Sequence, residues 1–195
     1  DAGRFPQFAQ YRTYNDARSV DHSRLSVEVL RQEGILDVLR REERQWIETA
    51  IEQHGHKALS PELRGQALLF AKLIRDADKL DIYRVVLDLH RQHQADPQGF
   101  AFETELSNEP RYSPNVFEAA MAGQVVSYDR LRTINDVRLC QIGWVYDINF
   151  AASLVRLRER GYIEELFAFL PRTDEIERFR ERIREYLDSR VPTGS

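Results

Sequence analysis

Three carboxylates lie close together in LIRDADKLDIYR, residues 73–84, a segment that is otherwise apolar and helical in character. Asp76, Asp78 and Asp81 all fall within six consecutive positions. A buried carboxylate is costly unless a cation or hydrogen-bond donors receive it. A metal ion is the simplest candidate for that cation. The alternative is an ion pair with an Arg or Lys in the core, or a helix cap.

Helical geometry separates these three acids. At about 100° per residue, Asp78 and Asp81 project within roughly 60° of each other, whereas Asp76 and Asp78 diverge by roughly 160°. The residues that share the face of Asp78 are apolar: Ile74, Ile82 and Val85. The pattern therefore predicts that Asp78 points inward and that Asp76 lies on another face.

Two histidines on earlier helical patterns offer further ligands. In QWIETAIEQHG, residues 45–55, His54 falls on the same helix face as the apolar residues. His22 follows Asp21, a favourable N-cap for the helical pattern SRLSVEVLRQEG. For either histidine taken alone, an ordinary core residue bonded to a carbonyl group is a more common explanation than a metal ligand. Together with the carboxylates, they make a ligand set suited to Mn, Mg, Fe, Co, Ni or Zn.

Four sequence blocks occur in an order that resembles the HD-domain metal-dependent phosphohydrolases: DAGRFPQF, DARSVDHSRLSVEVL, IEQHGHKAL and LIRDADKLDIYR. The resemblance covers roughly residues 1–93. It implies an all-α fold, namely a single HD-domain-like helical bundle with an extra C-terminal helical part. It also implies a divalent metal ion as cofactor and hydrolysis of a phosphomonoester or a nucleotide-like small substrate.

The resemblance assigns roles to individual residues. Asp1 matches the Asp of the family's His-Asp pair. His22 and His54 match its two intermediate histidines. Asp78 matches its terminal Asp ligand and would also serve in catalysis. Asp81 would then orient a ligand or a metal-bound water from outside the ligand set.

The family's first His, and the His directly before its Asp, are absent from this sequence, which begins with Asp1 rather than with Met. We therefore expect the natural chain to start earlier. We also expect the first metal shell to be incomplete here, so that the affinity of this chain for metal is much reduced.

Three residues near the histidines are candidates for contact with a phosphoryl group. Lys57, three residues after His54, is placed to neutralise charge that develops on that group, in catalysis and in substrate binding. Arg18 and His56 are further substrate-binding candidates. For Lys57 and Arg18 the alternative is an ordinary solvated surface charge.

The composition is that of an ordinary globular protein. Of 195 residues, 42% are hydrophobic and 31% charged, so the chain can form a substantial core. The single Cys140 excludes an internal disulfide, which favours a cytoplasmic location. A net charge of −4, with Arg interleaved with Glu, argues against a nucleic-acid binder. No apolar run is long enough to cross a membrane.

Helical patterns dominate the chain, and no alternating strand run is present. The start is expected to be partly extended. The expected helices cover residues 22–33, 36–54 with a break near Arg40, 61–93 starting from Ser60 and Pro61, 114–122, a helix capped by Asn135 and ended by Gly161, and a final amphipathic helix with Ile176, Phe179, Ile183 and Leu187. His90 and His93 look like surface residues. The polar segment 94–115 reads as an ordered loop or lid.

The expected organisation has three parts: an HD-like metal-binding core at residues 1–93, a loop and helices that complete the same domain at 94–190, and a tail at 191–195. The expected function is that of a metal-dependent phosphohydrolase acting on a small phosphorylated substrate. The incomplete ligand set keeps an alternative open. In that alternative, a catalytically inactive HD-like module binds a ligand or a partner protein in a regulatory role.

Overall fold

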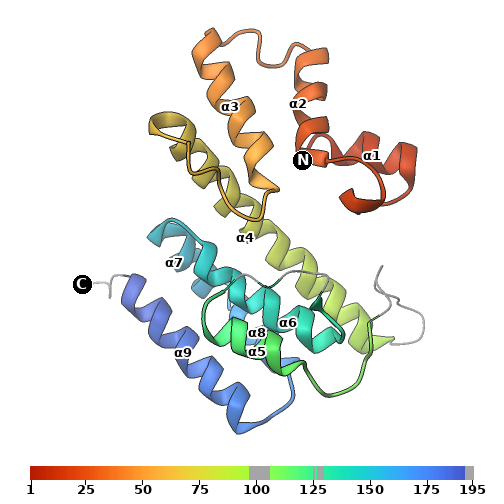
Figure 1. The fold of residues 1–195 in the computed structure, drawn as a ribbon, viewed down its shortest axis with the longest axis vertical. Coiled ribbons are helices and arrows are strands. Elements are labelled where there is room, and N and C mark those ends of the chain that lie inside the picture. The colour runs from red at the N-terminus through yellow and green to blue at the C-terminus, as the bar shows by residue number, and fades with distance from the viewer. Residues whose placement is uncertain (97–105, 125, 127–129, 192–195) are drawn as a thin grey trace. The chain divides into compact units, whose positions relative to one another are not determined.

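A computed structural model of the protein describes residues 1–96, 106–124, 126 and 130–191 (Figure 1). Over these residues the chain forms nine α-helices and short 3₁₀ turns, with no strand. The expected all-α class is thereby confirmed. The chain divides into two compact units, Asp1–Asp78 and Lys79–Ser195, and the boundary falls inside α4 (Gly65–Ala95).

Four elements precede α4 in the first unit: α1 (Arg4–Tyr11), the 3₁₀ turn η1 (Asp16–Arg18), α2 (His22–Gln32) and α3 (Arg41–His54). α2 packs against both α1 and α3. Trp46 of α3 meets Phe70 of α4 edge to face, with ring centroids 6.2 Å apart. Val27, Ala50 and Ala71 are almost fully buried in this unit.

α2 begins where the sequence predicted. The Asp21 side chain accepts hydrogen bonds from the backbone N–H groups of Ser23 and Arg24, as an N-cap does. The expectation of a partly extended start was wrong for α1. This helix buries the polar Gln7, while Phe5 and Phe8, three positions apart, are exposed.

The helix expected over residues 36–54 begins only after its expected break near Arg40, and the helix after it starts later than expected. α3 begins at Arg41, because the Glu43 carboxylate accepts the backbone N–H of Arg40 and so fixes the first turn. Ser60 and Pro61 do not open α4. The Ser60 hydroxyl instead accepts the N–H of Glu62 in a separate turn, and the helix starts at Gly65.

The second unit continues from the rest of α4 through α5 (Pro114–Met121), α6 (Ile134–Gly143), the 3₁₀ turn η3 (Trp144–Asp147), α7 (Ala151–Glu159), α8 (Tyr162–Ala168) and α9 (Asp174–Arg190). α6 packs against α5 and α8, and α7 packs against α8 and α9. The apolar face predicted for the last helix is buried: Ile176, Phe179, Ile183 and Leu187.

Asp136 fixes the start of α6. Its fully buried carboxylate accepts hydrogen bonds from the backbone N–H of Ser113, Arg132 and Thr133 and from the Ser113 hydroxyl, at 2.6–3.1 Å. The N-cap is therefore Thr133, whose hydroxyl accepts the Asp136 N–H, and the prediction of Asn135 was wrong.

The single helix expected from Asn135 to Gly161 is in fact three elements. α6 ends at Gly143, η3 follows, and the backbone is extended at Ile148 and Phe150 before α7 starts. The predicted end is correct, since Gly161 takes a left-handed conformation (φ 67°) directly after α7.

His90 and His93 are buried, at 0% and 6% exposure, so their assignment to the surface was wrong. Tyr83, Leu87 and His90 share one face of α4 in the second unit, and the Nε2 atom of His90 lies 2.8 Å from Oε1 of Gln141. Of the expected loop at 94–115, residues 97–105 lie outside the described residues. Of the expected tail at 191–195, only Val191 is described.

No helix in the described part of the chain combines the length and apolar character needed to cross a membrane.

Candidate metal centre

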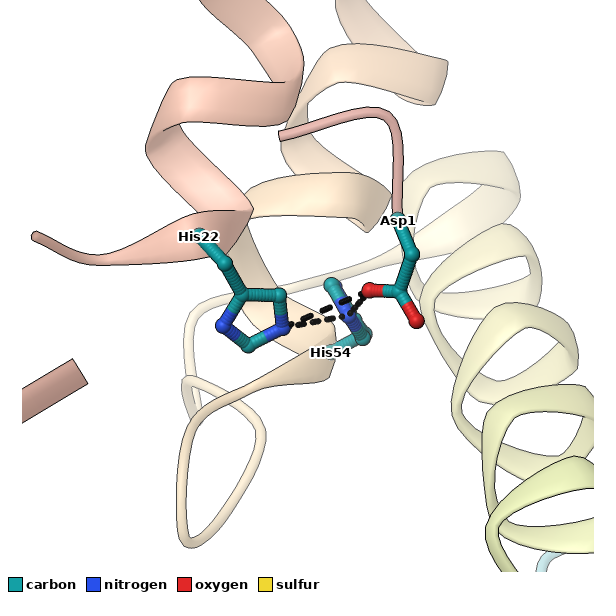
Figure 2. A group of neighbouring side chains, drawn as sticks. All are labelled: Asp1, His22 and His54. Atoms are coloured by element: carbon teal, nitrogen blue, oxygen red, sulfur yellow. Dashed lines mark hydrogen bonds and ion pairs between the residues drawn. The ribbon is translucent and has the colours of Figure 1, made fainter. Parts of the chain in front are cut away.

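Asp1, His22 and His54 come together in the first unit from three different segments (Figure 2). The Nε2 atoms of the two histidines are 3.2 Å apart. Oδ1 of Asp1 lies 3.5 Å from each of those nitrogen atoms. Three of the four ligands that the resemblance implies therefore converge.

The size of this triangle suits a metal ion. A point at its centre lies about 2.0 Å from each of the three ligand atoms, and Zn²⁺ and similar ions bind N and O ligands at about 2.0–2.2 Å. Two imidazoles and one carboxylate also form a ligand set that divalent transition metals use while keeping open positions. The residues present therefore fit such an ion.

The hydrogen bonds on the far side of each ring determine which nitrogen carries the proton. Nδ1 of His54 donates to the carbonyl of Ile51 at 2.5 Å, and a carbonyl can only accept. Nδ1 of His22 contacts Oδ2 of Asp16 at 2.6 Å. In the neutral rings both protons are thus on Nδ1, and both Nε2 atoms present lone pairs to each other and to Asp1.

Three acceptor atoms that face one another repel unless a cation lies between them. A proton on His22 is the simplest competitor to a metal. Burial, the largest cause, lowers the pKa of His22, despite the hydrogen bond that His22 donates to Asp16, which opposes this shift. The arrangement therefore disfavours a proton on Nε2 of His22 and leaves that atom as an acceptor.

The site is closed on the histidine side and open on the carboxylate side. The side chains of His22 and His54 are 7% and 4% exposed, whereas that of Asp1 is 53% exposed. A ligand from solvent therefore reaches the site past Asp1.

Asp16 orients His22 and is itself held by two neighbours. Its Oδ1 atom accepts hydrogen bonds from Arg4 at 3.0 Å and from Gln7 at 2.8 Å. Burial alone would raise the pKa of Asp16, but the bonds from His22 and Gln7 and the charge of Arg4 outweigh it and hold the pKa below its ordinary value. Asp16 is therefore a carboxylate suited to keep the proton on Nδ1 of His22.

Two glycines allow the segments to approach one another. A Cβ atom on Gly3 would lie 2.4 Å from the His22 carbonyl oxygen and 2.5 Å from the Ser26 nitrogen, so the chain after Asp1 lies directly against α2. A Cβ on Gly55 would lie 2.6 Å from Oγ of Ser23. Gly55 has ordinary helical angles, which any residue can adopt. A glycine is needed here because a side chain would not fit.

The burial of Asp76 and Asp78 in α4 is the reverse of what the helical pattern predicted. Asp76 is buried, at 2% exposure, whereas Asp78 is only half-buried. The apolar stripe used to orient the helix is not its buried face, since Val85 is 42% exposed. In the described residues, neither acid joins Asp1 and the two histidines among the ligand atoms within 4.8 Å of one another.

The other predicted residues lie outside the triangle. His56 and Lys57 are exposed in the loop after α3, and Arg18 is exposed at the end of η1. Asp81 belongs to the second unit, is exposed and pairs with Arg84 at 3.1 Å.

Sequence reasoning missed the residues that support the site, above all Arg4, Gln7, Asp16 and Arg75. Each acts through hydrogen bonds to partners six or more positions away, except for the contact between Arg4 and Gln7. No local spacing rule identifies such pairs. Gln7 and Arg75 are marked in the structure by their burial, which sequence patterns do not report.

A second group of possible ligands, Asp16, Asp21 and His22, lies on the other side of the His22 ring. Both carboxylates already accept hydrogen bonds from other groups: Asp16 from Arg4 and Gln7, and Asp21 from the backbone at the start of α2. Asp1, His22 and His54 are therefore the better candidate for a metal site.

No protein-family model matches the chain, and searches of curated proteins and of solved structures likewise find no match. The interpretation of the site thus depends on its geometry and on the resemblance of the four sequence blocks.

Proposed function

We propose that the protein is a metal-dependent phosphohydrolase that acts on a phosphomonoester or a nucleotide-like small substrate. The observation that supports this most directly is the triangle of Asp1, His22 and His54, in which three lone-pair atoms surround a point at metal-ligand distance. The order of the HD-like sequence blocks supplies the reaction class.

Two imidazole ligands favour Mn, Fe, Co, Ni or Zn over Mg and Ca, which prefer oxygen ligands. When bound, such an ion supplies Lewis acidity toward a phosphoryl oxygen and activates water at neutral pH. Asp16 and the Ile51 carbonyl keep the protons on the Nδ1 atoms, so both Nε2 atoms stay available as ligands.

In this proposal the exposed loop residues contact the substrate. Lys57 and His56 follow directly after α3 and carry donors suited to phosphate oxygens. Arg18 is a third candidate for that role. For the fourth metal ligand the resemblance names Asp78, and the burial of Asp76 makes it the competing candidate.

The proposal is tested by purified protein loaded with Mn, Co, Ni or Zn and supplied with a panel of phosphomonoesters and nucleotides. We expect release of phosphate that His54→Ala abolishes and Lys57→Ala reduces while leaving metal binding intact. Asp37→Asn, which changes an exposed acid paired with Arg44 in the same unit, is the matched control and should keep activity.

Two results would count against the proposal. If His54→Ala binds metal as well as the unaltered protein does, the triangle is not the metal centre. If metal binds at the triangle but no substrate in the panel is hydrolysed, the regulatory, non-catalytic HD-like module becomes the better interpretation.

A further inference from the structure

α3 ends at the metal centre without the usual C-terminal cap. His54 is its last residue, and Gly55 keeps right-handed angles (φ −77°, ψ −8°) instead of the left-handed ones that close many helices. The last carbonyl groups of a helix have no partners within the helix. The carbonyl groups at and after His54 therefore take their partners from outside α3, either from water or from another part of the chain.

Arg75 of α4 fills this role. Its Nη1 atom donates to the carbonyls of His54 at 3.2 Å and His56 at 2.5 Å, and its Nη2 atom donates to the carbonyl of Lys57 at 2.8 Å. The side chain is only 4% exposed. A single guanidinium thus joins the end of α3 and the following loop to α4.

We propose that Arg75 is the positioning residue of the metal centre: it fixes the backbone of His54 and the direction of the loop that carries His56 and Lys57. This inference rests on the proposed metal site but concerns a residue that contacts neither metal nor substrate. It explains why a charged side chain is buried in α4 beside the predicted acidic segment.

The geometry requires an arginine rather than any cation. The planar guanidinium presents several N–H donors in a fixed fork, so it can hold three carbonyl groups at once. A lysine keeps the charge but presents a point-like ammonium on a flexible stem. Arg75→Lys should therefore retain the charge and lose the alignment of His54.

The first experiment measures Co²⁺ binding and the visible absorption spectrum of bound Co²⁺. Residues that orient metal ligands typically change metal affinity by 10–100-fold when substituted. We expect the Kd for Co²⁺ to rise at least about tenfold in Arg75→Gln and Arg75→Lys, with an altered spectrum.

Ala71→Gly is the matched control. It lies one helical turn before Arg75, is fully buried, and weakens the same helix without removing a side-chain hydrogen bond. If Arg75 were merely structural, its variants and Ala71→Gly would lose thermal stability alike while the Co²⁺ spectrum stayed unchanged. That result would overturn the inference.

The second experiment needs no metal. Nitrogen-15 NMR of the histidine rings reports which nitrogen carries the proton. In the unaltered protein His54 should be protonated at Nδ1, and in Arg75→Gln the signal should shift toward a mixture of the two tautomers. An unchanged His54 tautomer would also overturn the inference. Failure of the unaltered protein to bind Co²⁺ would count against the proposed function alone.

Discussion

His22 and His54 meet through their Nε2 atoms, 3.2 Å apart, although 32 positions separate them in the sequence. Each ring uses Nδ1 to bind an acceptor on its own side, Asp16 for His22 and the Ile51 carbonyl for His54. The two lone pairs therefore face each other across a space that also holds the carboxylate of Asp1. This relationship determines what the site can bind, and it leads to the following predictions.

Metal should stabilise the protein through the histidine pair. A ligand that binds only the native state at 100 times its Kd adds about 2.7 kcal/mol to the free energy of unfolding. We expect Co²⁺ or Zn²⁺ to raise the Tm of the unaltered protein and of His56→Ala. His54→Ala should show no such rise. Scanning calorimetry with and without a chelator checks this, and an equal rise in His54→Ala would exclude the assigned centre.

Asp76 and Asp78 of α4 should differ in their effect on metal binding. Asp76 is buried and directly follows Arg75, whose guanidinium contacts the carbonyl of His54, whereas Asp78 is half-buried. We expect Asp76→Asn to weaken Co²⁺ binding at least about tenfold and Asp78→Asn to change it little. Titration calorimetry measures the Kd for Co²⁺ in both variants and shows which of the two acids contributes to metal binding. The reverse order would support the ligand assigned by the resemblance.

Asp16 should matter although it is not expected to touch the metal. Asp16→Asn replaces the carboxylate that receives the Nδ1 proton of His22 and removes the charge that pairs with Arg4. Metal affinity should fall about 10–100-fold. Asp37→Asn makes the same chemical change at an exposed ion pair of the same unit and should leave affinity unchanged. Equal affinities in the two variants would remove Asp16 from the site.

Gly3→Ala should displace the Asp1 carboxylate. The new Cβ would lie 2.4 Å from a backbone oxygen and 2.5 Å from a backbone nitrogen of α2, so the chain must move. Overpacking of this kind typically costs about 1–3 kcal/mol. We expect lower stability together with weaker metal binding. Ala9→Gly, on an exposed position of α1, should lower stability alone.

The stability of the second unit should decrease in acid because of His90. Burial is the main cause that lowers the pKa of His90 to about 4, against 6.5 for an ordinary histidine. The unfolded chain therefore takes up a proton below pH 6.5 while the folded unit stays neutral until about pH 4. Between those values the loss in the free energy of unfolding should reach on the order of 3 kcal/mol.

The two tryptophans make this measurable. Trp46 lies in the first unit and Trp144 in the second, so urea unfolding of a Trp46→Phe protein followed by fluorescence reports on the second unit. The contribution of His90 is the difference between this protein and one that also carries His90→Gln, which cannot titrate. If both lose stability equally between pH 7 and pH 4, His90 is not the cause.

The parts of the site that carry local signals could be predicted from the sequence. The N-cap at Asp21 and the apolar spacing before His54 each depend on a few neighbouring residues, and both are present in the structure. The helical class follows in the same way from periodicity. The sequence did not predict which polar side chains are buried: Gln7 of α1 and His90 of α4 are both fully buried.

The sequence by itself determined that the chain is helical and which residue types are available as metal ligands. Only the tertiary structure decided that Asp1, His22 and His54 meet and that Asp76 rather than Asp78 is the buried acid of its segment. Only the tertiary structure shows that Arg75 binds the end of α3. The physical reason is that these contacts join residues distant in sequence. Their geometry depends on how closely the helices pack, which positions such as Gly3 and Gly55 permit.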